Sequence, residues 1–221
     1  MAGKPMTVCR ELSDLPFAAS LTVHKGDLEA GVVYDGRHFA DVTITGAEAG
    51  GATFLECAFT DVTVEGGRSR RSRFSDVWLR DVRLLSADLS GSSWLDAAFL
   101  GCSAAGIQAF EASLRRVVFT GCKLDSVNFR TAVLADVTFE DCLLRDVDFG
   151  GATIKRARFP GCTLTGADFS RAALDKVDLR GADLDITAGY ESLRGAIIST
   201  AQLLSMAPSL ARQIGIVVRD S

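Results

Sequence analysis

The chain has 221 residues, of which 48% are hydrophobic and 24% charged, and its formal net charge is -4. This length allows one large domain or two small ones, and the composition is that of an ordinary soluble globular protein. Because no run of 18 apolar residues and no basic-then-apolar N-terminal pattern occurs, we expect neither a membrane span nor a secretory signal, and we expect a cytoplasmic location.

The N-terminal stretch, residues 1–31, has no internal repeat, in contrast to the segment that follows it. A repeat array exposes backbone and apolar surface at its two ends, so natural arrays carry caps. We therefore expect residues 1–31 to cap the N-terminal end of an array that occupies residues 32–185.

The array is defined by an apolar residue at every fifth position from Phe54 to Leu184, without an insertion or deletion. Phe or Leu fills 21 of these 27 positions, and only Ser69, Ala104 and Ala109 are weak. A small residue, most often Ala, Val or Cys, stands two positions before each large one. A short fixed period of this kind is the signature of a repeat architecture.

Each five-residue unit is predicted to be a short extended edge followed by a corner. The small and large residues are two positions apart, so in an extended segment both point to the same side. Glycine is frequent where the chain must then turn, as at Gly101, Gly121 and Gly161.

Four units are expected to close one coil. From Phe119 to Leu174 the large position alternates between Phe and Leu or Ile, and Cys102, Cys122, Cys142 and Cys162 recur every 20 residues. A four-sided coil of this length stacks these cysteines in one column and fills its interior with side chains, as close packing requires. About seven such coils are expected.

The cysteines are interpreted as packing residues. Five of the six occupy the small position of the repeat, free cysteine behaves as a small buried hydrophobe, and the sequence has no C-x-x-C pair and only His24 and His38 as histidines. We expect no disulfide set, no metal site and no cofactor.

The frame breaks after Leu184, and residues 186–221 are expected to form a frame break, a helical tail and a terminal strand. Ser199 and Gln202 have the spacing of a capping box that opens a helix. Pro208 is expected to kink or split that helix, Gly215 to end it, and Ile216 to Val218 to form an edge strand. One apolar face of the helix is the candidate dimer interface: Leu203, Met206, Ala207, Leu210 and Ile214.

No catalytic constellation is recognisable. The sequence lacks a nucleophile elbow, a phosphate-binding glycine loop followed by Lys, and any usable His, Cys and Asp spacing. We expect no enzymatic activity and no catalytic residues.

Surface charge provides the candidate binding site. Acidic residues recur two positions after the large residue, on two adjacent corners of the expected coil, where they form a broken stripe. The acidic corners, a term kept below for these seven residues, are Glu56, Asp61, Asp76, Asp81, Asp96, Asp136 and Asp141. A second column, at Asp88, Asn128, Asp148 and Asp168, is interpreted as bonding the neighbouring backbone.

Basic residues offset much of this charge. The segment from Arg37 to Asp185 holds 21 acidic and 18 basic residues. Three basic residues interrupt the stripe toward the C-terminal half: Arg116, Arg156 and Lys176. Four arginines, Arg68, Arg70, Arg71 and Arg73, cluster in one corner region, either as a solvated turn or as a contact to an acidic partner or phosphate. A nucleic-acid binder needs a stronger basic balance and exposed aromatics, so direct nucleic-acid binding is not expected.

The repeat resembles that of the pentapeptide repeat proteins, whose unit is commonly written A(D/N)LXX. The segments Ala167–Arg171 and Ala182–Leu184 match it, and the resemblance covers residues 32–184. It implies an all-β fold, a right-handed quadrilateral β-helix, with a C-terminal helical segment for dimerisation or capping. In related proteins such a tail gives a head-to-head homodimer.

The resemblance also implies a function. Several dimeric members are similar to duplex DNA in width and charge, bind DNA gyrase and sometimes topoisomerase IV, and protect these enzymes from quinolones or natural inhibitors. The acidic corners are then the candidate partner-binding residues. The alternative hypothesis is a pentapeptide-repeat scaffold that binds another protein along one side.

Overall fold

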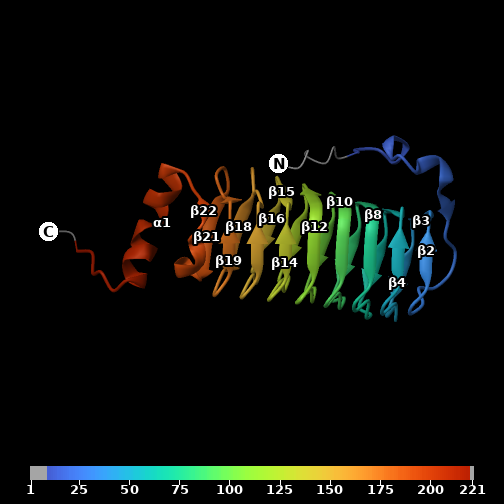
Figure 1. The fold of residues 1–221 in the computed structure, drawn as a ribbon, viewed down its shortest axis with the longest axis horizontal. Coiled ribbons are helices and arrows are strands. Elements are labelled where there is room, and N and C mark those ends of the chain that lie inside the picture. Colours follow the sequence, from blue (N-terminus) through green and yellow to red (C-terminus); the bar gives the residue numbers. More distant parts are fainter. Residues whose placement is uncertain (1–8, 220–221) are drawn as a thin grey trace.

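The chain forms a rod of about eight stacked coils followed by one helix (Figure 1). The computed structural model describes residues 9–219. Neighbouring coils pair in parallel in the register that the repeat predicts, as in Phe119 with Phe139 and Leu124 with Leu144. The predicted all-β, four-sided solenoid is confirmed. It has one coil more than the seven expected, because strand pairing extends beyond residues 32–185 at both ends.

Two long parallel sheets run along the rod. The eight-stranded sheet forms one side and consists of β4 (Thr43–Thr45), β7 (Thr63–Glu65), β9 (Arg83–Leu85), β11 (Ser103–Ala105), β13 (Lys123–Asp125), β16 (Leu143–Arg145), β18 (Thr163–Asp168) and β21 (Asp183–Ala188).

The twelve-stranded sheet forms two sides, because its longest strands continue around a corner. It consists of β1 (Thr22–Val23), β2 (Val33–Asp35), β3 (Arg37–Ala40), β5 (Thr53–Leu55), β6 (Ala58–Thr60), β8 (Arg73–Arg80), β10 (Ser93–Leu100), β12 (Ser113–Thr120), β14 (Val133–Ala135), β15 (Thr138–Glu140), β17 (Thr153–Lys155) and β19 (Ala173–Asp175). On the fourth side, single bridges such as Asn128 to Asp148 replace strands.

The core is the lumen of the coil. Phe119, Phe139 and Phe159 stack in one column with ring centroids 4.8 and 4.9 Å apart. Phe129, Phe149 and Phe169 form another, with centroids 5.6 and 5.1 Å apart. Leu and Ile fill the columns between them and are buried. The predicted alternation of aromatic and aliphatic columns is confirmed.

The predicted cysteine column is also present. Cys102, Cys122, Cys142 and Cys162 are buried free thiols. The Cys122 backbone N–H donates to the Cys142 Sγ at 3.4 Å, and each of the four thiols donates to a backbone carbonyl of the preceding coil. These sulfurs therefore pack between successive coils, as expected from their place in the repeat.

The lumen is incompletely filled where the repeat is weakest. Ala104 and Ala109 are smaller than the next residues in their columns, which are Leu84 and Leu124 for Ala104 and Leu89 and Phe129 for Ala109, and an apolar cavity of about 50 Å³ lies beside them. Its lining includes Leu84, Trp94 and Leu124. The cavity follows from the two missing side chains, because each neighbouring coil keeps its own register.

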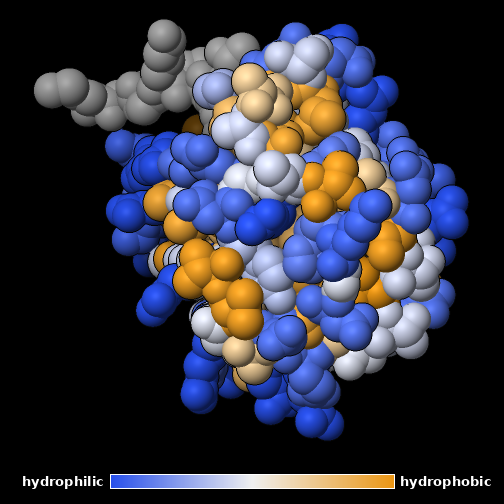
Figure 2. All heavy atoms as spheres, turned by 90° about the vertical axis from the view of Figure 1, so that its right-hand side faces the viewer, coloured by the Kyte–Doolittle hydropathy of each residue, from blue (hydrophilic) through white to orange (hydrophobic). Residues whose placement is uncertain are grey.

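The N-terminal residues do not simply cover the end of the rod. β1 pairs with β3 and adds to the first coil. Residues 9–21, with 3₁₀ turns at Leu12–Asp14 and Ala18–Ser20, lie instead along the side of the rod, as the blue ribbon in Figure 1 shows. Residues 1–8 of the predicted cap lie outside the described residues. The end that carries the first coil has apolar patches broken by hydrophilic surface (Figure 2), with Val23 and Val33 exposed.

The other end is closed by an irregular last coil. β21 contains a bulge, and a 3₁₀ turn spans Tyr190–Leu193. β22 (Ala196–Ile197) then pairs with β20 (Val177–Asp178), with Ala196 opposite Val177 where the regular register would place Ile197. The predicted frame break is thus a coil that is shorter than the others.

The helix α1 (Thr200–Gln213) lies across this last coil (Figure 1). It opens with the predicted capping box between Ser199 and Gln202. It ends before Gly215, whose φ of 79° allows the Gly215 and Ile216 N–H groups to cap the helix carbonyls of Arg212 and Ala211.

For the tail, one alternative for Pro208 is excluded and the predicted strand is wrong. Pro208 does not split the helix, which continues through it from Thr200 to Gln213. Ile216 to Val218 form no strand and are exposed, and the chain after α1 runs away from the coils (Figure 1).

Candidate functional site

The acidic corners are corner residues in a strict conformational sense. Every fifth residue from Gly31 to Gly181 has a positive φ, so the chain turns each corner in the left-handed conformation. Asp, Asn and Gly tolerate this conformation better than most residues. All seven predicted acids have φ between 46° and 58°. Shaping the corner is therefore one reason for an Asp at these positions.

The structure brings the seven acids together along two edges of one side of the rod. Glu56, Asp76, Asp96 and Asp136 share one corner column, and Asp61, Asp81 and Asp141 share the next, because each coil stacks on the previous one in constant register. The side between the two columns is formed by β3, β6, β15 and the second halves of β8, β10 and β12. Asp41, which was not among the predicted acids, has the same conformation and extends the column of Asp61 and Asp81.

Two of the acidic corners are neutralised by arginines in the same column. Arg116 donates to both carboxylate oxygens of Asp96, and Arg156 does the same to Asp136, with all four distances 2.6 Å. The hydrogen bond from Arg156 holds the pKa of the Asp136 carboxyl below its usual range. From Asp96 to Arg156 the column therefore alternates in sign, and its last corner, Lys176, is also basic.

The other acidic corners are less compensated. Asp81 lies 3.5 Å from the Arg80 guanidinium. Within residues 9–219, no salt bridge involves Glu56, Asp61, Asp76 or Asp141. Apart from Asp141, these less compensated carboxylates lie on the first half of the rod, at both edges of the same side.

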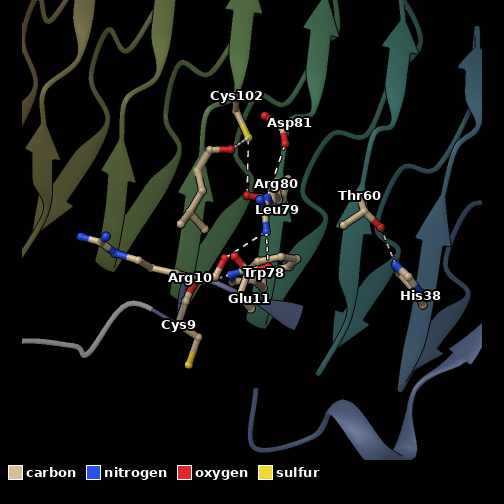
Figure 3. A network of polar contacts seen from close by, with 11 residues as sticks. Cys9, Arg10, Glu11, His38, Thr60, Trp78, Leu79, Arg80, Asp81 and Cys102 are labelled. Carbon is tan, nitrogen blue, oxygen red and sulfur yellow. Dashed lines mark hydrogen bonds and ion pairs between the residues drawn. The ribbon is translucent and has the colours of Figure 1, made fainter. Parts of the chain in front are cut away.

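Residues 9–21, named here the covering segment, occupy the side between these edges. Leu15 is buried against Ala58, Trp78 and Ala98, which point outward from β6, β8 and β10. The indole Nε1 of Trp78 donates to the Cys9 carbonyl at 2.9 Å, and Arg80 forms an ion pair with Glu11 at 2.6 Å (Figure 3). This contact was not predicted, although Trp78 is a large aromatic residue at an outward position of the repeat.

The column of Asp88, Asn128, Asp148 and Asp168 has a structural role, as predicted. The side chains of these residues accept hydrogen bonds from the backbone N–H two positions later, over distances of 2.7 to 3.0 Å: Asp88 from Ser90, Asn128 from Arg130, Asp148 from Gly150 and Asp168 from Ser170. These side chains stabilise local turns.

The arginine cluster is partly paired. Arg70 forms an ion pair with Asp88 at 2.6 Å, and Arg68 lies 3.9 Å from Glu48. Arg70 and Arg71 also line an open hollow of about 230 Å³ with Phe110 and Glu111. This hollow carries both signs of charge, which gives it no clear preference for an anion.

The five candidate dimer residues separate into two groups. Met206 is buried and Leu210 packs against the core of the last coil. Leu203, Ala207 and Ile214 are exposed, as is Leu204. Gln202 also donates to the carbonyls of Leu179 and Ala182, at 2.6 and 2.7 Å. One face of the helix therefore caps the rod, and the other leaves apolar side chains open.

Neither a metal cluster nor a spanning helix occurs in the described part of the chain. No group of three or more His, Cys, Asp or Glu side chains among residues 9–219 is placed to hold a metal ion. None of these residues belongs to a helix long and apolar enough to cross a membrane.

Comparisons with known proteins agree with the repeat. The family model of the pentapeptide repeat region matches residues 92–169 and 112–188. No curated protein sequence matches the chain. Among solved structures, HetL, a pentapeptide repeat protein involved in heterocyst differentiation regulation from the cyanobacterium Nostoc sp. strain PCC 7120, is 21% identical, with 78% of this chain and 92% of that chain covered and a TM-score of 0.47.

A second solved structure is a trypsin-treated form of QnrB1, a plasmid-mediated fluoroquinolone resistance protein. It is 20% identical, with 85% of this chain and 99% of that chain covered and a TM-score of 0.43. Neither likeness bears on function.

Proposed function

We propose, from the premise that residues 92–188 are a pentapeptide repeat region, that this chain is a non-enzymatic binding protein that imitates DNA. Its partner is DNA gyrase or topoisomerase IV, and binding protects the enzyme from quinolones or natural gyrase inhibitors. The acidic corners provide the contact. The observation that carries the proposal is the pair of carboxylate columns along both edges of one side of the rod.

The chemistry of the contact is electrostatic. An enzyme that binds DNA offers a cationic channel, and carboxylates repeated at the spacing of the coils, about 4.8 Å, give such a channel a regular series of charges. A rigid rod presents these charges without the cost of ordering a flexible chain. Glu56, Asp61 and Asp76, which form no salt bridge within the described residues, are the strongest candidates.

A second copy of the chain extends the rod. The exposed apolar residues of the tail, Leu203, Leu204, Ala207, Ile214 and Ile216, lie at the end of the rod, and their burial against the same residues of another copy gives a head-to-head homodimer. Such a dimer doubles the length of the charged surface.

A supercoiling assay tests the proposal. The protein is titrated into DNA gyrase with and without a fluoroquinolone, and we expect altered supercoiling or restored activity in the presence of the drug. In the triple variant Glu56→Gln, Asp61→Asn, Asp76→Asn the effect should need at least about ten times more protein, since each lost charge pair weakens the contact. No effect of the wild-type protein at large molar excess removes this function.

The matched control changes the same charge elsewhere. Glu65, Asp175 and Asp183 are exposed on other sides of the rod, and the variant Glu65→Gln, Asp175→Asn, Asp183→Asn should act like the wild type. Equal losses of potency in both triple variants would mean that the effect depends on net charge alone and not on the acidic corners.

A pentapeptide-repeat scaffold for another protein is the second candidate. The ion pairs of Asp96 with Arg116 and of Asp136 with Arg156 favour it, because they break the run of negative charge that imitation of DNA requires. This candidate predicts binding through the same side without any change in gyrase activity.

A further inference from the structure

The outward surface of one side of the rod departs from the repeat pattern. On the other sides the outward residues are mostly polar or charged, as at Arg83, Ser103 and Lys123. Between the two columns of acidic corners, Ala58, Trp78 and Ala98 form an outward apolar strip instead. A strip of this kind needs a cover, since exposed apolar patches on soluble proteins mark contact surfaces.

The covering segment fills this strip with few strong contacts. Leu15 is the one fully buried residue among residues 9–21, while Leu12 and Phe17 remain half-buried. The segment forms no strand pairing before β1. Its ion pair from Glu11 to Arg80 has side chains 61% and 39% exposed, and exposed pairs contribute little to stability.

The charge of the covering segment does not complement the charge of the surface beneath it. The covering segment contains Arg10 against Glu11 and Asp14, so its net charge is -1. It lies between Glu56 and Asp76 on one edge and Asp61 and Asp81 on the other. An anionic segment on this acidic side adds little positive charge for the corner carboxylates. Among these four, only Asp81 lies near a cation within the described residues, and that cation, Arg80, also pairs with Glu11 of the segment. A segment with the same apolar residues and with Lys or Arg beside them would satisfy both surfaces.

We infer that this side of the rod is a binding groove for a basic amphipathic segment of a partner protein, and that the covering segment occupies the groove until such a segment displaces it. The inference rests on the proposed role of the acidic corners. It adds that the partner contributes an apolar anchor at Trp78 as well as cations, and that the chain limits access to its own site. Local release of a weakly packed terminal segment is a low-energy event.

Trp78 reports on the groove directly. The chain has two tryptophans, and Trp94 stacks on Phe74 in the lumen with ring centroids 3.7 Å apart. The variant Trp94→Phe keeps this stack and leaves Trp78 as the only tryptophan. Its emission should shift to longer wavelength when the covering segment leaves and water reaches the indole.

The test compares two variants in the Trp94→Phe background. Leu15→Asp places a charge on the apolar strip and should release the segment, whereas Ser13→Asp adds the same charge at an exposed position of the same segment. The probe is a synthetic amphipathic peptide of Lys and Leu. We expect Leu15→Asp to bind the peptide about ten-fold more tightly than Ser13→Asp, since competition by the segment lowers the apparent affinity.

The outcomes separate cleanly. If the two variants bind the peptide with equal affinity, the covering segment does not compete for the site. If the peptide still binds after the triple change at Glu56, Asp61 and Asp76, this side of the rod is not the binding site. Trp78 emission that depends on protein concentration would assign the groove to the covering segment of a second copy and also overturn the proposal. Gyrase is absent from this assay, so the two proposals can fail separately. Peptide binding together with a negative supercoiling result would support the binding groove and reject the gyrase function.

Discussion

Arg116 holds the carboxylate of Asp96 from the preceding coil with two hydrogen bonds of 2.6 Å, one from Nε to Oδ1 and one from Nη2 to Oδ2. The same pair recurs two coils later as Arg156 and Asp136. Both arginines turn a corner in the left-handed conformation, with φ of 53°. Corner positions of one column therefore supply both the acidic residues of the stripe and the arginines that neutralise two of them.

Removing this cancellation should strengthen the proposed contact. Arg116→Asn frees the Asp96 carboxylate, and Asn tolerates the left-handed corner. We expect greater potency in the gyrase assay and a steeper loss of binding with added salt, because one more unscreened charge faces the partner. The control is Arg171→Asn, a corner arginine with φ of 59° outside both acidic columns. Equal potency of the two variants would contradict a role for the stripe.

The Asp136–Arg156 pair should give stability a measurable pH dependence. Arg156 lowers the pKa of Asp136 in the folded protein, so the unfolded chain takes up this proton first as the pH falls. The pair's contribution is present above the usual Asp pKa, near 4, and is lost as the pH falls through the lower folded value. Chemical melts of the wild type and Asp136→Asn should therefore differ at pH 7 and converge toward pH 2. A difference independent of pH would argue against this pair as its source.

The repeat allowed most of the rod to be predicted. Each coil copies the previous one, so the five-residue period predicts the sides of the coil and the 20-residue recurrence of Cys and Phe predicts the stacked columns. Phe139 and Cys142 are buried at the positions that these periods predict. The Ser199–Gln202 capping box is equally local and was also predictable. Such features need only neighbouring residues or a fixed register.

Features outside the repeat could not be predicted in the same way. The contact of Leu15 with Trp78 joins a unique segment to the rod, and no periodicity encodes it. The ion pairs could have been found, since Arg116, Arg145 and Arg156 each stand one full coil after their Asp partner. Met206 is buried and Leu204 is exposed because of the way the helix crosses the last coil. Helical periodicity alone does not determine this crossing.

The cavity beside Ala104 should be open to stabilisation. Its volume is about 50 Å³ and its lining is apolar, so added methyl groups gain burial without displacing polar contacts. Ala104→Val, which matches Val64 in the same column, should raise the free energy of unfolding by about 1 kcal/mol in urea melts. Leu124→Ala should enlarge the cavity and lower it by about 2–5 kcal/mol. A loss of stability in Ala104→Val would mean that the lumen is already full.

The two faces of α1 make separate predictions for capping and for dimerisation. Leu204 is 70% exposed, so Leu204→Arg should convert a dimer to a monomer in light scattering while the melting temperature of the dilute protein stays near that of the wild type. Met206 is 4% exposed against the last coil, so Met206→Arg should lower stability by burying an unpaired charge. Because the two residues are neighbours on one helix, a general effect of charge on the tail would act on both variants alike. If Leu204→Arg keeps the mass of the wild type while Met206→Arg unfolds, the tail only caps its own rod, and the surface offered to a partner is that of a single chain.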